Sequence, residues 1–249
     1  MSLIQFLIVC PLAFLAGLVD SIAGGGGLIS MPAFLLAGLP VHNAIATNKL
    51  SSCIGTTAST FRYCKKGFFN KKIAVPTIIG ALIGSAIGAH LVLMVDEKYL
   101  KWLLIIVLPI VAVTIFLDKS KHKEDLDYPE NKRFIIAVIS AFVIGMYDGF
   151  YGPGTGTFLL IMLTFFAHMD VRTASGNTKL INLSSNIAAL VTFIFSGNVN
   201  FILGLAGAAF CTAGHYIGSG MVIKNGNKVV KPIIITVLAL LFIKIIMGN

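Results

Sequence analysis

Two lysines of this sequence stand inside long apolar segments, and small polar residues follow each of them at helical spacing. The residues three and seven positions further on are Ser52 and Thr56 after Lys49, and Asn182 and Asn186 after Lys179, which itself follows Thr178. This spacing places each set on a single face of a helix. An ammonium group beside hydroxyl and amide groups suits a small oxyanion better than a cation. The sequence therefore predicts a polar, anion-binding site.

The cost of burying charge bears on how these lysines are interpreted. A charged side chain at the centre of a bilayer costs roughly 2.5–3.5 kcal/mol on insertion scales. A single lysine near a helix end commonly extends its ammonium group to the membrane surface instead. Lys49 and Lys179 occupy matching positions in two halves of the chain, with matching polar neighbours, and this repetition favours a shared site that faces inward.

Two glycine clusters interrupt apolar sequence at matching points. The strings are "DSIAGGGGLISMP" from Asp20 and "DGFYGPGTGTFLL" from Asp148. Irregular backbone at membrane depth is tolerated only inside protein or beside a water-filled cavity. If new helices begin near Leu28 and Thr157, their N-terminal amides face a common site and favour an anion. The substrate-binding residues expected here are Gly24, Gly25, Gly26, Gly27, Gly152, Gly154, Thr155 and Gly156. Close helix packing by small residues is the alternative.

The acidic residue before each glycine cluster has three candidate roles. Asp20 and Asp148 can balance the charge of the lysines, relay protons, or cap the turn by accepting from its backbone amides. The residue types alone do not decide among these roles.

The composition is that of a polytopic membrane protein. Of the 249 residues, 57% are hydrophobic and 12% charged, whereas globular domains average roughly 45–50% and about 25%. The mean hydropathy is +0.91. The net charge of +9 comes from basic residues in short loops between apolar segments, so it does not indicate nucleic-acid binding.

The apolar segments fall into two classes by length. Long candidates for a bilayer span are Ile45–Tyr63, Ile73–Val95, Tyr99–Leu117, Ala174–Phe195, Phe201–Ile223 and Lys231–Met247. Four shorter segments flank the glycine clusters, and we interpret them as half-helices or tilted pairs: Ile4–Val19, Leu28–Leu39, Phe134–Tyr147 and Thr157–His168. The predicted fold is all-α, with about eight transmembrane helices and two glycine-broken or re-entrant helical pairs.

The two halves of the chain form an internal repeat. "VHNAIATNKL" from Val41 matches "VRTASGNTKL" from Val171, and "GALIGS" from Gly80 matches "GHYIGS" from Gly214. We divide the chain into a first transmembrane repeat at 1–117, a charged cytoplasmic linker at 118–133 and a second transmembrane repeat at 134–249.

The charges of the loops predict the orientation of the repeats. Segments 62–72 and 224–231 are basic and free of acids, which places them in the cytoplasm together with 118–132. The uncharged turn 196–200 and both termini are then external. Each half crosses the membrane an odd number of times, so the repeats are related by inverted topology, as in many secondary transporters.

Other functional classes find little support in the sequence. Cys10, Cys53, Cys64 and Cys211 have no metal-binding or disulfide spacing, and the histidines are scattered. The string "GPGTG" does not match a nucleotide-binding motif, and no catalytic arrangement is recognisable. We expect no enzymatic activity, no metal and no cofactor.

The paired glycine motifs and lysine strings resemble the TauE/SafE family of membrane transporters, described as sulfite exporters or toluenesulfonate uptake permeases. The resemblance covers essentially the whole chain. It implies a bacterial-type inner-membrane or plasma-membrane permease, usually drawn with eight helices, that moves sulfite or organosulfonate anions. The second glycine motif departs from the form richest in glycine, because Pro153 and Thr155 stand among its glycines.

The predicted function is secondary transport of a small anion by alternating access at a midplane site between the repeats. The alternatives are an anion channel, an uptake permease for another small oxyanion or carboxylate, and a membrane subunit that serves a partner protein. The expected partners are the anion and membrane lipid, without nucleic acid, and a homodimer is left open.

Overall fold

The computed structural model describes residues 2–96, 98–99, 128–226, 228–230 and 232–233, and its regular elements in these ranges are all helices. The bounds of the helices are α1 Leu3–Ala23, α2 Gly27–Leu36, α3 Val41–Lys65, α4 Lys71–Leu93, α6 Glu130–Phe150, α7 Thr155–Ile161, α8 Val171–Phe195 and α9 Phe201–Asn225. Helix α7 continues as a π-helix over Met162–Phe166. The expected spans Tyr99–Leu117 and Lys231–Met247 lie outside the described residues or almost entirely so.

Side-chain caps fix where several of these helices begin. Asp170 accepts hydrogen bonds from the amides of Arg172 and Thr173 at the start of α8. Asn70 and Asn200 accept in the same way at the starts of α4 and α9. A cap of this kind satisfies amides that the first helical turn leaves without a partner.

The glycine clusters end one helix and begin the next, as the sequence predicts. Gly24 closes α1 in the left-handed conformation, with φ of 79°, and its amide donates to the carbonyl of Asp20. Gly152 and Gly154 also have positive φ, between α6 and α7. Residues with a Cβ rarely adopt this conformation, so glycine suits these turns.

The prediction of short segments on both sides of each break was half right. Helices α1 and α6 have 21 residues each, long enough to cross a bilayer, whereas the helices after the breaks are short. The expected segments Ile4–Val19 and Phe134–Tyr147 were too short because the helices run on through Asp20 and Asp148 to the glycines. Their polar residues face other helices, which the apolar pattern alone does not reveal.

Five described helices are long and apolar enough to span a membrane: α1, α4, α6, α8 and α9. Helix α3 has 25 residues but is too polar to belong to this set. Its polar side chains, among them Asn48, Lys49 and Thr56, are buried within the bundle. Helix α3, which covers the expected span Ile45–Tyr63, therefore turns its polar face into the bundle, whereas Ile54 and Phe61 stay exposed.

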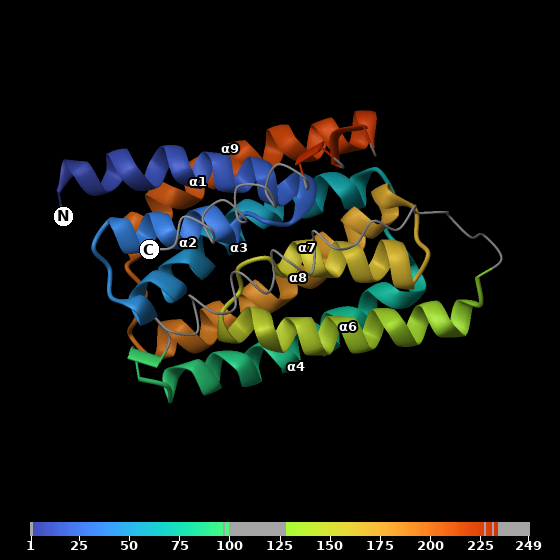
Figure 1. Cartoon of the computed structure of the whole chain (residues 1–249), viewed down its shortest axis with the longest axis horizontal. Coiled ribbons are helices and arrows are strands. Elements are labelled where there is room, and N and C mark those ends of the chain that lie inside the picture. The colour runs from blue at the N-terminus through green and yellow to red at the C-terminus, as the bar shows by residue number, and fades with distance from the viewer. Residues whose placement is uncertain (1, 97, 100–127, 227, 231, 234–249) are drawn as a thin grey trace, which may run out of the picture.

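Helices from distant parts of the sequence pack side by side (Figure 1). Helix α1 runs alongside α9 in the same direction, and α4 runs alongside α6 in the same direction. Both contacts depend on glycine. A Cβ at Gly17 would overlap the carbonyl of Cys211, and one at Gly149 would overlap the carbonyl of Ser85. Helices α3 and α8 lie between these pairs, and they contact each other as well as α9 and α4, respectively.

The basic loops meet at one end of the molecule. Arg172 lies over the ring of Phe68 and donates to the carbonyl of Lys224, which brings the loop after α3 close to the end of α9. Lys72 forms an ion pair of 2.8 Å with Glu130, so α4 and α6 begin at that same end. The segments that the sequence assigns to the cytoplasm are therefore neighbours where they are described.

The break at Gly24 gives a test of close packing. We expect Gly24→Ala to destabilise the protein by about 1–3 kcal/mol more than Gly38→Ala does. Both glycines have positive φ, 79° and 86°, but a Cβ at Gly24 would overlap Gly156, whereas nothing lies within 4 Å of one at Gly38. Gly38→Ala therefore carries only the cost of the left-handed backbone, about 1–2 kcal/mol. The free energy of unfolding of both variants can be measured in mixed micelles. Equal losses of stability would contradict the close contact between Gly24 and Gly156.

Candidate functional site

A cavity lies where the two glycine breaks meet α3 and α8. Its volume is about 320 Å³, including space open to solvent. The residues that line it come from both halves of the sequence: Asp20, Gly24, Gly27, Asn48, Lys49, Ser52, Thr56, Asp148, Gly152, Thr155, Gly156, Asn182 and Asn186. The lining is almost wholly polar or glycine, which is unusual for the interior of an apolar helical bundle.

Lys49 lines this cavity, where a carboxylate and an amide hold its ammonium group. Its Nζ lies 2.8 Å from Oδ2 of Asp148 and donates to Oδ1 of Asn186 at 3.1 Å. The side chains of Lys49 and Asp148 are only 2% and 3% exposed. Ser185 donates to the same carboxylate oxygen at 2.5 Å. The charge of Lys49 is therefore balanced inside the protein and does not reach the membrane surface.

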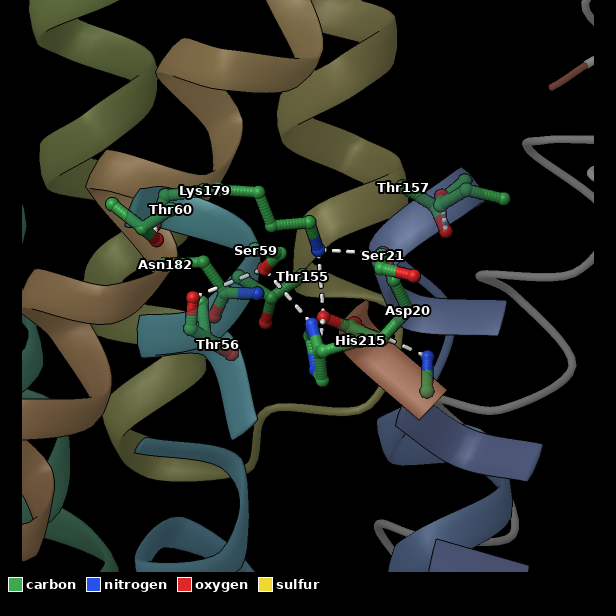
Figure 2. Close-up of polar contacts among 12 residues, drawn as sticks. Asp20, Ser21, Thr56, Ser59, Thr60, Thr155, Thr157, Lys179, Asn182 and His215 are labelled. Carbon is green, nitrogen blue, oxygen red and sulfur yellow. Dashed lines mark hydrogen bonds and ion pairs between the residues drawn. The ribbon is translucent and has the colours of Figure 1, made fainter. Parts of the chain in front are cut away.

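Lys179 is buried in a similar way, and Figure 2 shows it pointing at Asp20. Its Nζ lies 2.6 Å from Oδ2 of Asp20 and also donates to the backbone carbonyl of that residue. His215, from α9, approaches the same carboxylate, with Nε2 at 3.5 Å. The other ring nitrogen of His215 is 2.9 Å from Oγ of Ser59 on α3. Four helices thus meet at Asp20.

The ion pairs cross between the two halves of the sequence. Lys49 of the first half pairs with Asp148 of the second, and Lys179 of the second half pairs with Asp20 of the first. Of the roles that the sequence left open, charge balance fits the geometry of both aspartates. Asp20 also caps its turn, because Oδ1 accepts from the amide of Gly26 at 3.2 Å.

The two pairs differ in their surroundings. Ser185, which donates to Asp148, sits on α8 at the position that corresponds to Gly55 on α3 when "VRTASGNTKL" is matched with "VHNAIATNKL". A Cβ at Gly55 would overlap Sγ of Cys211 and press against the ring of His215. Glycine there leaves room for the imidazole beside Asp20, whereas a serine hydroxyl fills the corresponding place beside Asp148.

The structure brings together most of the residues that the sequence singled out. Lys49, Ser52, Asn182 and Asn186 line the cavity with both aspartates, and so do the site residues Gly24, Gly27, Gly152, Thr155 and Gly156. The remaining expected residues are not part of the lining: Gly25, Gly26, Gly154, Thr178 and Lys179. Lys179 lies behind Asp20, so only one of the two lysines faces the space that a ligand would occupy.

The glycine breaks serve packing as well as lining. The amide of Thr157 donates to the carbonyl of Gly24 at 3.2 Å, and its hydroxyl donates to the carbonyl of Ala23 at 2.9 Å. A Cβ on Gly24 or Gly156 would overlap the backbone of the other glycine. The close-packing alternative therefore holds for these two residues. The amides of Gly26 and Thr157, which we expected to face an anion, already have partners.

Sequence reasoning missed three participants. Asn48 lines the cavity next to Lys49, and its Oδ1 is buried without a hydrogen-bond partner among the described residues. His215 and Ser185 were not recognised because the matching residue in the other half of the sequence is not polar. His215 occupies the position of Ala81 when "GHYIGS" is compared with "GALIGS". A sequence signal for such residues was available: a polar residue in one half of the chain matches an apolar residue or glycine in the other.

Metal ligation has no support in the described parts of the chain. No group of three or more His, Cys, Asp or Glu side chains there is arranged to hold a metal ion. The site described here instead holds two ammonium groups, two carboxylates, hydroxyls and amides, which can bind polar or charged small molecules by hydrogen bonding.

The crossed pairing can be tested by double substitution. We expect Lys49→Ala alone to destabilise the protein by about 3–5 kcal/mol, because it leaves the carboxylate of Asp148 buried without its counter-charge. Adding Asp148→Ala should recover much of this loss, whereas adding Asp20→Ala should increase it. Unfolding of the purified protein in mixed micelles gives the comparison. If Asp20→Ala, and not Asp148→Ala, restored the stability lost in Lys49→Ala, then Lys49 would be paired with Asp20 and the crossed pairing would be wrong.

Comparison with known proteins agrees with this architecture. The family described as "Sulfite exporter TauE/SafE" matches residues 9–245. A "Probable membrane transporter protein ORF9" from Sinorhizobium sp is 34% identical over 245 residues, which is 98% of this chain and 92% of the relative. The "Probable membrane transporter protein YfcA" of Escherichia coli K12 is 33% identical, over 94% of this chain and 87% of the relative.

A more distant relative extends the comparison to Bacillus subtilis. Its "Probable membrane transporter protein YdhB" is 24% identical, over 87% of each chain. No solved structure matches the chain significantly. The family match over nearly the whole length, together with two relatives above 30% identity, places the protein among multi-pass membrane transporters rather than enzymes. The chain belongs to the TauE/SafE family of membrane transporters.

Proposed function

We propose that this protein is a secondary transporter that moves a small anion, sulfite or an organosulfonate, by alternating access at the cavity around Lys49. One observation carries the proposal: a polar cavity inside an apolar bundle is bounded by two glycine breaks and contains a lysine among hydroxyl and amide groups. Ionisable residues within membrane-spanning segments commonly mark the path of a substrate.

The arrangement of the helices supports two repeats of inverted topology. Helices α1 and α6 each end at a glycine break and a short helix, α3 and α8 each carry a buried lysine, and α4 and α9 complete the sets. Each helix of the first set runs opposite to its counterpart in Figure 1. Secondary transporters with inverted repeats place their substrate sites at the repeat interface, where discontinuous helices meet. Rocking one repeat against the other would open the cavity to alternate sides.

The cavity favours a small oxyanion. The space is small, about 320 Å³ even when the part open to solvent is included. Lys49 offers an ammonium group, and Ser52, Thr56 and Asn182 offer neutral donors around the same space. Several donors around one cation fit the several oxygens of a sulfite or sulfonate group. The family name also points to sulfite.

The membrane potential sets the direction for an anion that moves alone. A cell interior at −100 mV drives a monoanion outward with about 2.3 kcal/mol, so export needs no other fuel. Uptake of the same anion needs a coupled ion. The proposed location is the inner or plasma membrane, with both termini external and the segments 62–72, 118–132 and 224–231 cytoplasmic.

The role of Lys49 can be tested by binding and flux. We expect Lys49→Gln to weaken anion binding roughly 10- to 100-fold, because a charge-assisted hydrogen bond is lost. Lys72→Gln is the matched control, since this lysine is 73% exposed at the surface, and its binding should be unchanged. The probes are sulfite, methanesulfonate, acetate and chloride, added to purified protein and to liposomes that contain it.

The outcomes separate the competing functions. Saturable flux that is accelerated by anion on the opposite side supports a transporter, whereas flux proportional to the electrochemical gradient supports a channel. Binding and flux of none of the four anions would contradict the proposal and favour a subunit that serves a partner protein. Equal losses in Lys49→Gln and Lys72→Gln would also contradict it, because they would reflect net charge alone.

The orientation has its own test. In a cysteine-free background, Lys66→Cys in the basic loop and Asn198→Cys in the uncharged turn should react with a membrane-impermeant thiol reagent from opposite sides. We expect labelling of residue 198 in intact cells and of residue 66 only after the membrane is opened. The reverse pattern would contradict the proposed orientation and leave the transport proposal standing.

A further inference from the structure

We propose that Asp148 takes up a proton when the anion binds at Lys49, so that anion and proton occupy the cavity together. This inference rests on the proposed function and names its coupling ion. It follows from the charges around the cavity and from the hydrogen bonds of Asp148, which differ in kind from those of Asp20.

The cavity is electrically balanced before any ligand enters. The charges of Lys49 and Lys179 are each matched by a carboxylate within 2.8 Å. A monoanion that entered alone would leave one negative charge uncompensated in a buried site, and such a charge is costly. A proton on one carboxylate removes this cost, because the anion then replaces that carboxylate as the partner of a lysine.

Asp148 has neighbours that suit both of its protonation states. Oγ of Ser185 lies 2.5 Å from Oδ2 of Asp148 and 3.0 Å from the carbonyl of Asn182. A hydroxyl has one hydrogen, so it donates to one of these acceptors at a time. When Asp148 is charged, Ser185 donates to it. When Asp148 is protonated, its own hydroxyl donates to Oγ of Ser185, and Ser185 turns its hydrogen to the carbonyl.

Lys49 is not left without a partner by this change. Oδ1 of Asn186 still accepts from its ammonium group at 3.1 Å, and the group lines the cavity. The hydrogens that Asp148 no longer accepts are then available to the oxygens of the anion. Protonation of Asp148 thus converts a paired lysine into an anion site.

Protonation of Asp20 would expose no ammonium group to an anion, because its partner Lys179 does not line the cavity. Its carboxylate accepts from the ammonium group of Lys179 and from the amide of Gly26, and neither donor can turn into an acceptor. Nε2 of His215 lies 3.5 Å from the same carboxylate, farther than Oγ of Ser185 lies from Asp148, and its other ring nitrogen contacts Ser59. We therefore infer that Asp20 stays charged and has a structural role, in which it holds α1, α8 and α9 together.

The groups that face Asp148 come from several helices. Lys49 from α3 and Ser185 from α8 contact the carboxylate directly. Asn186 of α8 accepts from the same Lys49, and Tyr147, next to Asp148 in the sequence, donates its hydroxyl to the carbonyl of Pro153. Ser85 of α4 contributes through the backbone, since its hydroxyl donates to the carbonyl of Ser185 at 2.5 Å. Lys49 is the only charged residue among these described neighbours. The anion and the proton therefore both act on the ion pair between Lys49 and Asp148.

The charge that moves with each cycle follows from this stoichiometry. One proton and one monoanion together carry no net charge, so the membrane potential does not drive them. A proton gradient that is acidic outside then favours uptake. The proton comes from solvent on the side of entry and leaves to solvent on the other side, with no covalent change in the anion.

The test uses the purified full chain and methanesulfonate, which stays a monoanion between pH 5 and pH 9. Calorimetric titration in two buffers of different ionisation enthalpy gives the protons taken up with the anion. We expect about one proton taken up per anion at neutral pH, and affinity that falls about tenfold per pH unit as the pH rises. Asp148→Asn should bind without proton uptake and with affinity independent of pH, because its amide is neutral at every pH.

A second pair of variants covers the case in which Asp148→Asn does not fold with Lys49 unpaired. Ser185→Ala removes the donor to the charged carboxylate as well as the acceptor of the protonated one. Because the charge-assisted bond is the stronger of the two, its loss favours protonation and should strengthen methanesulfonate binding at neutral pH by roughly tenfold or less. Ser184→Ala is the matched control, because its hydroxyl donates only to the carbonyl of Leu180 in its own helix, and binding should not change. Thermal unfolding of each variant identifies losses that come from misfolding.

Different results overturn different claims. Binding of methanesulfonate without proton uptake, or proton uptake that persists in Asp148→Asn, would overturn the coupling and leave anion transport intact. Equal effects of Ser185→Ala and Ser184→Ala would overturn the role of the serine hydroxyl. Failure of the wild-type protein to bind any of sulfite, methanesulfonate, acetate and chloride would overturn the proposed function, and the coupling with it.

Discussion

Two lysine–aspartate pairs join one half of the chain to the other and fix where the buried helix ends meet. An ammonium group in the interior of an apolar bundle requires a counter-charge at contact distance. Lys49 and Lys179 find theirs at the ends of α6 and α1, directly before the glycine breaks. The breaks must therefore come close to α3 and α8, and the cavity is the space left where they do.

Close glycine contacts allow this convergence. The backbones of Gly24 and Gly156 touch, and glycines on α1, α4, α6 and α9 let the outer helix pairs approach at backbone distance. In an apolar surrounding, packing of this kind replaces much of the hydrophobic effect that drives helices together in water. The same residues that give the bundle its tight outer pairs thus leave a polar interior, where irregular backbone and ionised side chains are compatible with the membrane.

Much of this was predictable from the sequence, and the exceptions have physical reasons. Helical spacing predicted that Ser52 lies beside Lys49, because it depends only on local geometry. It placed Asn182 and Asn186 with Lys179, whereas in the structure they line the cavity with Lys49. The aspartate partner of each lysine could not be predicted, since matching the two halves of the sequence shows which residues correspond but not which ones meet. His215 was missed because its counterpart, Ala81, is apolar. The lengths of α1 and α6 were underestimated because polar residues at their ends face other helices.

Binding of an oxyanion at Lys49 between the two breaks can be tested by locating a bound anion. Selenite is an oxyanion similar to sulfite, and its selenium atom can be located by anomalous X-ray scattering from crystals of the protein. We expect a selenium peak in the cavity within about 4 Å of Nζ of Lys49, and its loss in Lys49→Gln. A peak outside the cavity, with transport of selenite intact, would contradict binding at Lys49.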